Sequence, residues 1–128
     1  MEKRLLHCRI CVTTPFPYPY AEEGEHVRGL PIYIDENISP EELKDIHLDE
    51  VSSKDGTLNT LYVSGTSGSC IYITGLGDTV DKARERAYNL IEKVSIPKMF
   101  YRHDIGVNFM SVQLPKLQSL GYLKKMVL

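Results

Sequence analysis

The sequence predicts an α+β domain in which an apolar strand leads directly into one amphipathic helix. Cys70 to Ile73 is an unbroken apolar run of strand-forming residues, which suits a strand covered on both faces. Gly75 and Gly77 then break the run, and they suggest a sharp strand-to-helix corner with positive φ. An amphipathic helix is expected over about 79–94. We therefore expect one compact β-to-α unit from Ser69 to Val94.

The helix has one apolar stripe and needs a surface to pack on. Asp78 and Thr79 are both suitable N-caps. The apolar residues recur at steps of three and four: Val80, Ala83, Ala87, Leu90, Ile91 and Val94. Burying each larger side chain contributes roughly 1.5 to 3 kcal/mol, whereas fixing each backbone residue costs about 1 to 2 kcal/mol. The helix must therefore dock, and the preceding strand is the nearest partner.

Length and charge exclude several classes of protein. A chain of 128 residues fits one domain. Its net charge of -2, without a Lys/Arg run, predicts no nucleic-acid partner and no membrane-surface partner. The sequence contains no apolar segment long enough to span a membrane, and the charged N-terminus does not resemble a signal peptide. We expect a cytoplasmic protein.

The first strand is expected over residues 4–13 and contains a Cys-x-x-Cys pair, Cys8 and Cys11. Metal-binding or redox chemistry requires the two thiols to converge. Residues three apart on a strand point to opposite faces, so these thiols diverge. We interpret both as ordinary strand cysteines and expect no metal site in this chain.

An aromatic and proline-rich segment follows the first strand, with Phe16, Tyr18 and Tyr20 alternating with prolines. Prolines at this spacing favour a stiff, extended loop. The segment is either a rigid connector that covers an edge of the core or one wall of a binding cleft, since a stiff loop loses little entropy on contact.

The middle of the chain predicts short elements. A strand is expected over 30–34, and Ser39 with Glu42 forms a capping-box pattern at the start of a helix of one or two turns. A brief strand at 46–48 and a hairpin tip at 54–57 follow. The Ser/Gly run at 64–69 lacks a phosphate-binding lysine and leads into a strand, so it predicts a turn between strands.

The last third contains a charged cluster and a tail. Arg102, His103 and Asp104 form either a surface ion-pair cluster or an acid–base group. Residues 1–110 are predicted to form the domain, and residues 111–128 a helical tail with Pro115 near the helix start and Gly121 at its end.

Several motifs together resemble a known family. They are Thr74-Gly75-Leu76-Gly77-Asp78-Thr79, the helix pairs Ala83-Arg84 and Ala87-Tyr88, and Phe100-Tyr101-Arg102-His103-Asp104-Ile105-Gly106. Over roughly Cys8 to Gly106 the chain is similar to the C-terminal domain of glycinamide ribonucleotide synthetase, also called phosphoribosylamine-glycine ligase.

The resemblance implies a β-rich rudimentary hybrid-motif fold, similar to a barrel-sandwich, with one main helix and a short C-terminal helix. It also implies a parent ATP-grasp ligase of purine biosynthesis that uses ATP and Mg²⁺, with its metal-binding carboxylates in other domains. This chain is then expected to hold no cofactor, to catalyse nothing alone, and to pack on the N-terminal and ATP-grasp domains of the same or a separate chain.

The departures from the family pattern lie in loops. The glycines of the family's Gly-Gly-Tyr-Pro-Gly loop are replaced around Tyr18, and its Gly-Gly-Arg becomes Gly68-Ser69-Cys70. The family's His-Ala-Gly-Thr becomes His47-Leu48-Asp49-Glu50. Loops determine substrate choice more than the supporting strands and helices do, so these departures bear on which substrate the parent enzyme uses.

Two hypotheses follow. In the first, the chain completes the active site of a larger ligase, and the residues expected in the shared cleft are Phe16, Tyr18, Tyr20, His47, Ser67, Gly68, Ser69, Arg102 and Asp104. Arg102 is expected to contact an anion or an interdomain carboxylate, and the turn at 67–69 to offer backbone N–H groups. In the second, the chain is a stand-alone interaction or regulatory module. Its contact surface, possible between two copies, is Leu117, Leu120, Tyr122 and Leu123 of the tail.

Overall fold

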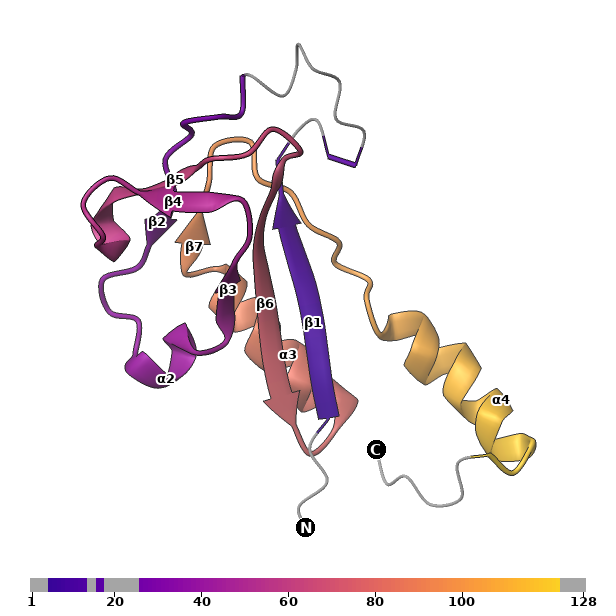
Figure 1. The fold of residues 1–128 in the computed structure, drawn as a ribbon. Helices are drawn as coiled ribbons and strands as arrows, with labels where there is room; N and C mark the ends of the chain where they lie inside the picture. Colours follow the sequence, from indigo (N-terminus) through magenta and orange to yellow (C-terminus); the bar gives the residue numbers. More distant parts are fainter. Residues whose placement is uncertain (1–4, 14–15, 18–25, 123–128) are drawn as a thin grey trace.

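The computed structural model describes residues 5–13, 16–17 and 26–122, and it shows an α+β fold. The main sheet is antiparallel and three-stranded, in the order β1-β6-β3. Two smaller antiparallel pairs, β2-β7 and β4-β5, lie beside it (Figure 1). The strands are β1 (Leu5–Val12), β2 (Tyr33–Ile34), β3 (Ile46–Leu48), β4 (Val51–Ser53), β5 (Leu61–Val63), β6 (Ser69–Gly77) and β7 (Val94–Ser95).

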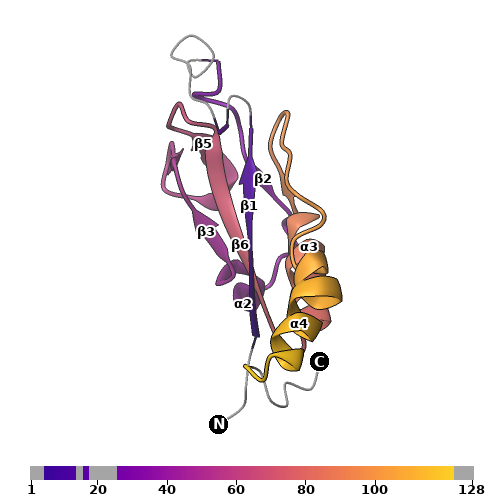
Figure 2. The same ribbon diagram turned by 90° about the vertical axis from the view of Figure 1, so that its right-hand side faces the viewer.

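Helix α3 (Val80–Ile91) covers one face of the main sheet, as the two views in Figures 1 and 2 show together. Its N-cap is Thr79, whose hydroxyl accepts a hydrogen bond from the Lys82 N–H at 3.2 Å. Its inward stripe buries Ala83, Ala87, Leu90 and Ile91. The predicted helix is therefore confirmed, although it ends three residues earlier than expected because Val94 pairs with Ile34 in the β2-β7 sheet.

The two glycines before α3 have a different role from the one predicted. β6 continues through Gly75 and Gly77, which pair with His7 and Leu5 of β1, and neither glycine has a positive φ. A Cβ at Gly75 would lie 2.2 Å from the Ala83 carbonyl oxygen, and a Cβ at Gly77 2.5 Å from the Ala83 nitrogen. The expected glycine corner is thus wrong. The glycines are required because the helix backbone lies directly against the strand.

The expectation that both faces of the central strand are covered is correct only for its first residues. Cys70, Ile71 and Ile73 are fully buried, whereas Tyr72 is 36% exposed. Tyr72 points to the sheet face opposite α3, since alternate side chains of a strand point to opposite faces. That face remains open to solvent at Tyr72.

The shorter predicted elements in the middle of the chain are confirmed, except that the strand expected over 30–34 is reduced to β2 (Tyr33–Ile34) and an isolated bridge at Pro31. α2 (Pro40–Leu43) begins with a complete capping box between Ser39 and Glu42. β3 lies where a brief strand was expected. β4 and β5 form a hairpin whose connection contains the 3₁₀ turn η1 (Leu58–Thr60).

The tail is helical over a longer stretch than predicted. It contains a π-helical segment η2 (Phe109–Gln113) that continues into α4 (Leu114–Ser119), so helix precedes Pro115. Leu114 is fully buried, while Val112, Leu120 and Tyr122 are 57%, 61% and 76% exposed. In Figures 1 and 2, α4 lies at one side of the strands and α3.

Candidate functional site

Four of the predicted site residues meet at the end of the sheet where β1 ends and β6 begins. The Thr13 N–H donates to the Gly68 carbonyl oxygen at 2.8 Å, and the Phe16 N–H donates to the Thr13 carbonyl oxygen at 3.0 Å. Gly68 has φ +79°, and a Cβ there would lie 2.2 Å from the Thr13 oxygen. Glycine is required here both for its backbone conformation and for this close contact. Phe16 and the 67–69 turn therefore lie together.

Two carboxylates hold this turn. Glu50 Oε2 accepts hydrogen bonds from the Ser67 hydroxyl at 2.6 Å and from the Ser67 N–H at 3.2 Å. Asp49 Oδ2 accepts from the Ser69 hydroxyl at 2.6 Å. All four side chains are at least half-buried, so these charge-assisted bonds fix the turn on the segment between β3 and β4.

The backbone N–H groups expected from the turn are partly used inside the protein. The Ser67 N–H donates to Glu50, and the Ser69 N–H donates to the Ser67 hydroxyl at 3.2 Å. In this structure, side chains of the chain itself accept the bonds from the Ser67 and Ser69 N–H groups.

Arg102 and Asp104 follow a segment that is bridged to the end of β1, and they lie beside α3. Phe100 exchanges two backbone hydrogen bonds with Val12, at 2.8 and 3.1 Å, and this bridge joins the segment to the end of β1. Two residues later Arg102 donates to Asp104 through Nε at 2.9 Å and through Nη2 at 2.7 Å. Asp104 raises the pKa of the Arg102 guanidinium, first through these bonds and then through its charge.

His47 lies apart from the 67–69 turn. It pairs with Tyr72 across β3 and β6, three residues along β6 from Ser69. That separation is about 10 Å along a strand. Its Nε2 lies 3.1 Å from the Thr74 hydroxyl. Tyr18 and Tyr20 are outside the described residues.

Cys70 lies directly beneath the turn and is not a reactive thiol. Its Sγ donates to the Gly68 carbonyl oxygen at 3.4 Å, and burial raises the pKa of the thiol. Cys11 is buried as well. Within the described part of the chain, the structure contains no cluster of three His, Cys, Asp or Glu side chains that could hold a metal ion.

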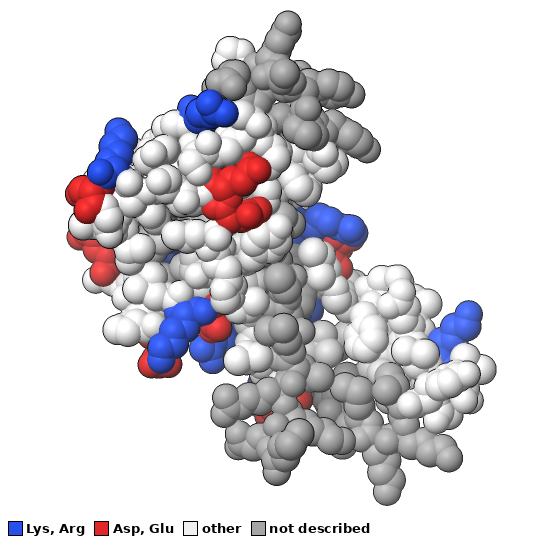
Figure 3. Space-filling model, viewed as in Figure 1, with Lys and Arg blue, Asp and Glu red and all other residues white. Residues whose placement is uncertain are grey.

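On the face shown in Figure 3, the charged side chains lie in small groups, and several of these groups combine Lys or Arg with Asp or Glu. In the ranges that the structure describes, none of the helices has the length and apolar character needed to cross a membrane.

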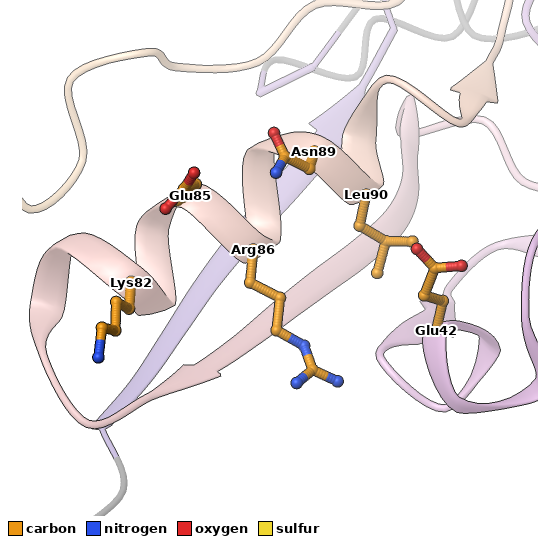
Figure 4. A pocket seen from close by; sticks show the side chains of 6 residues that line it. All are labelled: Glu42, Lys82, Glu85, Arg86, Asn89 and Leu90. Carbon is orange, nitrogen blue, oxygen red and sulfur yellow. The ribbon is translucent and has the colours of Figure 1, made fainter.

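A separate hollow of about 330 Å³ lies between α2 and α3 (Figure 4). Its lining residues are Glu42, Lys82, Glu85, Arg86, Asn89 and Leu90. Two ion pairs lie at its border, Arg86 with Asp45 at 3.0 Å and Lys93 with Glu42 at 2.6 Å. The predicted site residues that the structure describes do not line this hollow.

Sequence reasoning did not assign a role to the residues that hold the site. Asp49 and Glu50 bind the 67–69 turn, and Arg84 and Tyr88 contact the segment after Phe100. The spacing of Arg84 and Tyr88, four residues apart on one helix face, was a signal that could have indicated a shared partner. The pairing of Asp49 and Glu50 with serines far along the chain had no such local signal.

Comparison with known proteins assigns the family. The model for "Phosphoribosylglycinamide synthetase, C domain" matches residues 8–108. Phosphoribosylamine–glycine ligase of Caldanaerobacter subterraneus subsp. tengcongensis is 33% identical over 104 residues, 80% of this chain and 21% of that protein. The Pasteurella multocida ligase is 34% identical over 91 residues, 71% of this chain and 18% of that protein.

A solved structure supports the same assignment. The crystal structure of phosphoribosylamine–glycine ligase from Thermotoga maritima matches with a TM-score of 0.54 and 27% identity, covering 74% of this chain and 20% of that one. This chain thus spans about a fifth of the length of the relatives that it matches over most of its residues. It belongs to the family of phosphoribosylglycinamide synthetase C domains.

Proposed function

We propose that this chain is the non-catalytic C-terminal domain of a phosphoribosylamine–glycine ligase-like ATP-grasp enzyme, acting in purine biosynthesis or a related ATP-dependent ligation. The match of the family model to residues 8–108 is the observation that carries this proposal. In this role the domain completes an active site whose reactive groups lie in the N-terminal and ATP-grasp domains.

The contacts at the end of the sheet support a shaping role. The hydroxyls of Ser67 and Ser69 are bonded to carboxylates, and Arg102 is bonded to Asp104. These bonds fix the positions of the groups, and a surface of fixed shape is suited to meeting another domain. Phe16, Gly68 and the Arg102–Asp104 pair form the proposed contact region, and the proposal extends to His47, Tyr18 and Tyr20.

ATP and Mg²⁺ are proposed to bind outside this chain. The family resemblance supports this placement, because it puts the metal-binding carboxylates of the parent enzyme in the other domains. We also propose the finer architecture, a rudimentary hybrid motif, and a cytoplasmic location for the parent enzyme.

Reconstitution tests the proposal. The 128-residue chain and the separately produced remainder of a cognate ligase should together form ADP in a reaction that depends on both phosphoribosylamine and glycine. Neither part alone should do so at a comparable rate. If both parts are folded and their mixture remains inactive at concentrations up to ~100 µM, a range that captures weak domain contacts, the proposal is wrong.

The exposed tail favours a second candidate, a stand-alone interaction module. Leu120 and Tyr122, which directly follow the C-terminal helix α4, are 61% and 76% exposed. Size-exclusion chromatography of the chain with and without the residues after Phe109 tests this role. Because the truncation also removes the buried Leu114, the double variant Leu120→Ser/Tyr122→Ser is the better-matched comparison. An unchanged oligomeric state in both variants excludes the tail as the contact.

A further inference from the structure

The segment 100–106, here called the strap, is fastened to the body at three points. Phe100 is bridged to Val12 by two backbone hydrogen bonds. The Tyr88 hydroxyl donates to the Arg102 carbonyl oxygen at 3.1 Å, and Arg84 Nε donates to the Ile105 carbonyl oxygen at 2.9 Å. Two side chains of α3 therefore hold the backbone at Arg102 and at Ile105, the residue after Asp104.

Ring contacts reinforce this attachment. The rings of Tyr88 and His103 are stacked, with their centroids 6.2 Å apart and an interplanar angle of 4°. The ring centroids of Tyr101 and His103 are 4.7 Å apart. The Arg84 guanidinium lies 5.7 Å from the centre of the Tyr88 ring, so the two α3 residues also support each other. The Arg84 side chain is only 22% exposed. These contacts make a continuous layer between α3 and the strap.

The Arg102–Asp104 pair itself is highly exposed, with side-chain exposures of 73% and 64%. An exposed ion pair contributes little to stability, because water screens its charges and ordering two side chains costs entropy. The Arg102 guanidinium nevertheless donates two hydrogen bonds to the two carboxylate oxygens of Asp104. Three of its five N–H groups remain for another acceptor. Its placement therefore depends on the backbone that Arg84 and Tyr88 hold.

We propose that Arg84 and Tyr88 are positioning residues, which hold the strap so that the Arg102 guanidinium meets an oxyanion of the assembled ligase. The oxyanion is a phosphate of the substrate or a carboxylate of the ATP-grasp part. This inference rests on the proposed function for its ligand, but the positioning itself is a property of this chain.

The first experiment measures positioning without any activity. In the 128-residue chain, NMR follows exchange of the Arg102 Nε–H with water, with the signal assigned through its loss in Arg102→Lys. Tyr88→Phe and Arg84→Ala should speed this exchange several-fold, and Arg84→Lys should retain part of the protection. The matched controls are Tyr33→Phe, at an exposed tyrosine on β2, and Glu85→Gln, at the hollow on the other side of α3. Unchanged exchange in folded Tyr88→Phe and Arg84→Ala overturns the proposal.

The second experiment uses the reconstituted enzyme. Arg102→Ala should raise KM for the phosphorylated substrate about tenfold or more with little change in kcat if the ligand is the substrate phosphate. It should instead weaken the affinity between the two protein parts by a similar factor if the ligand is a carboxylate. Tyr88→Phe should shift the same quantity in the same direction, and adding it to Arg102→Ala should have little further effect. An Arg102→Ala variant that changes neither quantity overturns the proposal.

The two experiments separate the two proposals. If the wild-type mixture binds but has no ligase activity, the proposed function is wrong, while the exchange rates and the affinity between the parts still decide whether Arg84 and Tyr88 position Arg102.

Discussion

Gly75 of β6 lies against Ala87 of α3 so closely that a Cβ on the glycine would be 2.8 Å from the Ala87 nitrogen and 3.0 Å from its Cβ. The same atom would be 2.2 Å from the Ala83 carbonyl oxygen. Strand and helix are thus packed backbone to backbone, and the small residues on both sides are what allow it. This contact positions α3, and with it Arg84 and Tyr88.

Gly75→Ala should destabilise the domain, because the added methyl group meets helix backbone and not a movable side chain. Overpacking of a core costs about 1 to 3 kcal/mol and sometimes more. Chemical denaturation should show a lower free energy of unfolding with an unchanged m-value.

Two further variants test the cause of this loss. Glu85→Ala, on the exposed side of the same helix, should stay within about 0.5 kcal/mol of wild type. Ala87→Gly should not rescue Gly75→Ala, since the closest atoms belong to the helix backbone. A Gly75→Ala protein as stable as wild type would contradict the packing described here.

Glu42 should make the domain less stable at low pH. Hydrogen bonds from Lys93, then from Ser39, lower the pKa of Glu42 from 4.5 to about 2. Since the folded-state pKa lies below the unfolded one, this contribution is fully present above about pH 4.5 and is lost as the pH falls toward 2. Glu42→Gln should therefore lower the melting temperature at pH 6 but have little effect near pH 2.

Glu41→Gln is the matched control for this prediction. Glu41 is the neighbouring residue and pairs with Lys44, but both side chains are highly exposed. The melting temperature of Glu41→Gln should equal that of wild type from pH 2 to pH 6. If Glu42→Gln lowers the melting temperature equally at pH 6 and pH 2, the effect comes from packing and not from the charge of Glu42.

Local features of the fold could be predicted from the sequence because the atoms involved are close along the chain. The capping box joins Ser39 to Glu42, and Thr79 caps α3 through Lys82. Both contacts span three residues, so the residue types alone identify them.

The missed features depend on contacts between distant segments. Gly75 was assigned to a turn because a glycine required by a neighbouring helix has the same local pattern as one required by a corner. The partners of Ser67 and Ser69 lie 17 and 20 residues earlier in the chain. Only the folded topology brings them together, so the contacts that hold the 67–69 turn could not be predicted from the sequence.

The N-cap of α3 offers a test of helix stability. Thr79→Ala removes the hydroxyl that accepts from the Lys82 N–H and should cost about 1 kcal/mol, with a range of roughly 0.5 to 2. Thr79→Ser keeps the acceptor and should restore most of the loss. The measurement is the free energy of unfolding, and equal losses in both variants would show that the hydroxyl does not act as the cap.

Gly68→Ala should lower the stability of the domain and displace the 67–69 turn of the proposed cleft. Gly68→Ala places a Cβ at φ +79° and 2.2 Å from the Thr13 carbonyl oxygen, so the 67–69 turn must move away from the end of β1. The left-handed conformation alone costs an L-residue roughly 1 to 2 kcal/mol, and the contact with backbone adds to it. The free energy of unfolding should fall by about 2 kcal/mol or more.

Gly56→Ala is the matched control for Gly68, because Gly56 has a similar φ of +81° but no atom within 4 Å of the added Cβ. Gly56→Ala should lower the free energy of unfolding only by the cost of the left-handed conformation. It should leave reconstituted ligase activity unchanged, because Gly56 lies in the β4-β5 connection. Gly68→Ala should lose more stability than Gly56→Ala and should also weaken reconstitution at temperatures where the variant is still folded. Equal losses in the two variants would mean that the turn does not need its close approach to Thr13, and normal reconstitution by Gly68→Ala would remove the turn from the proposed cleft.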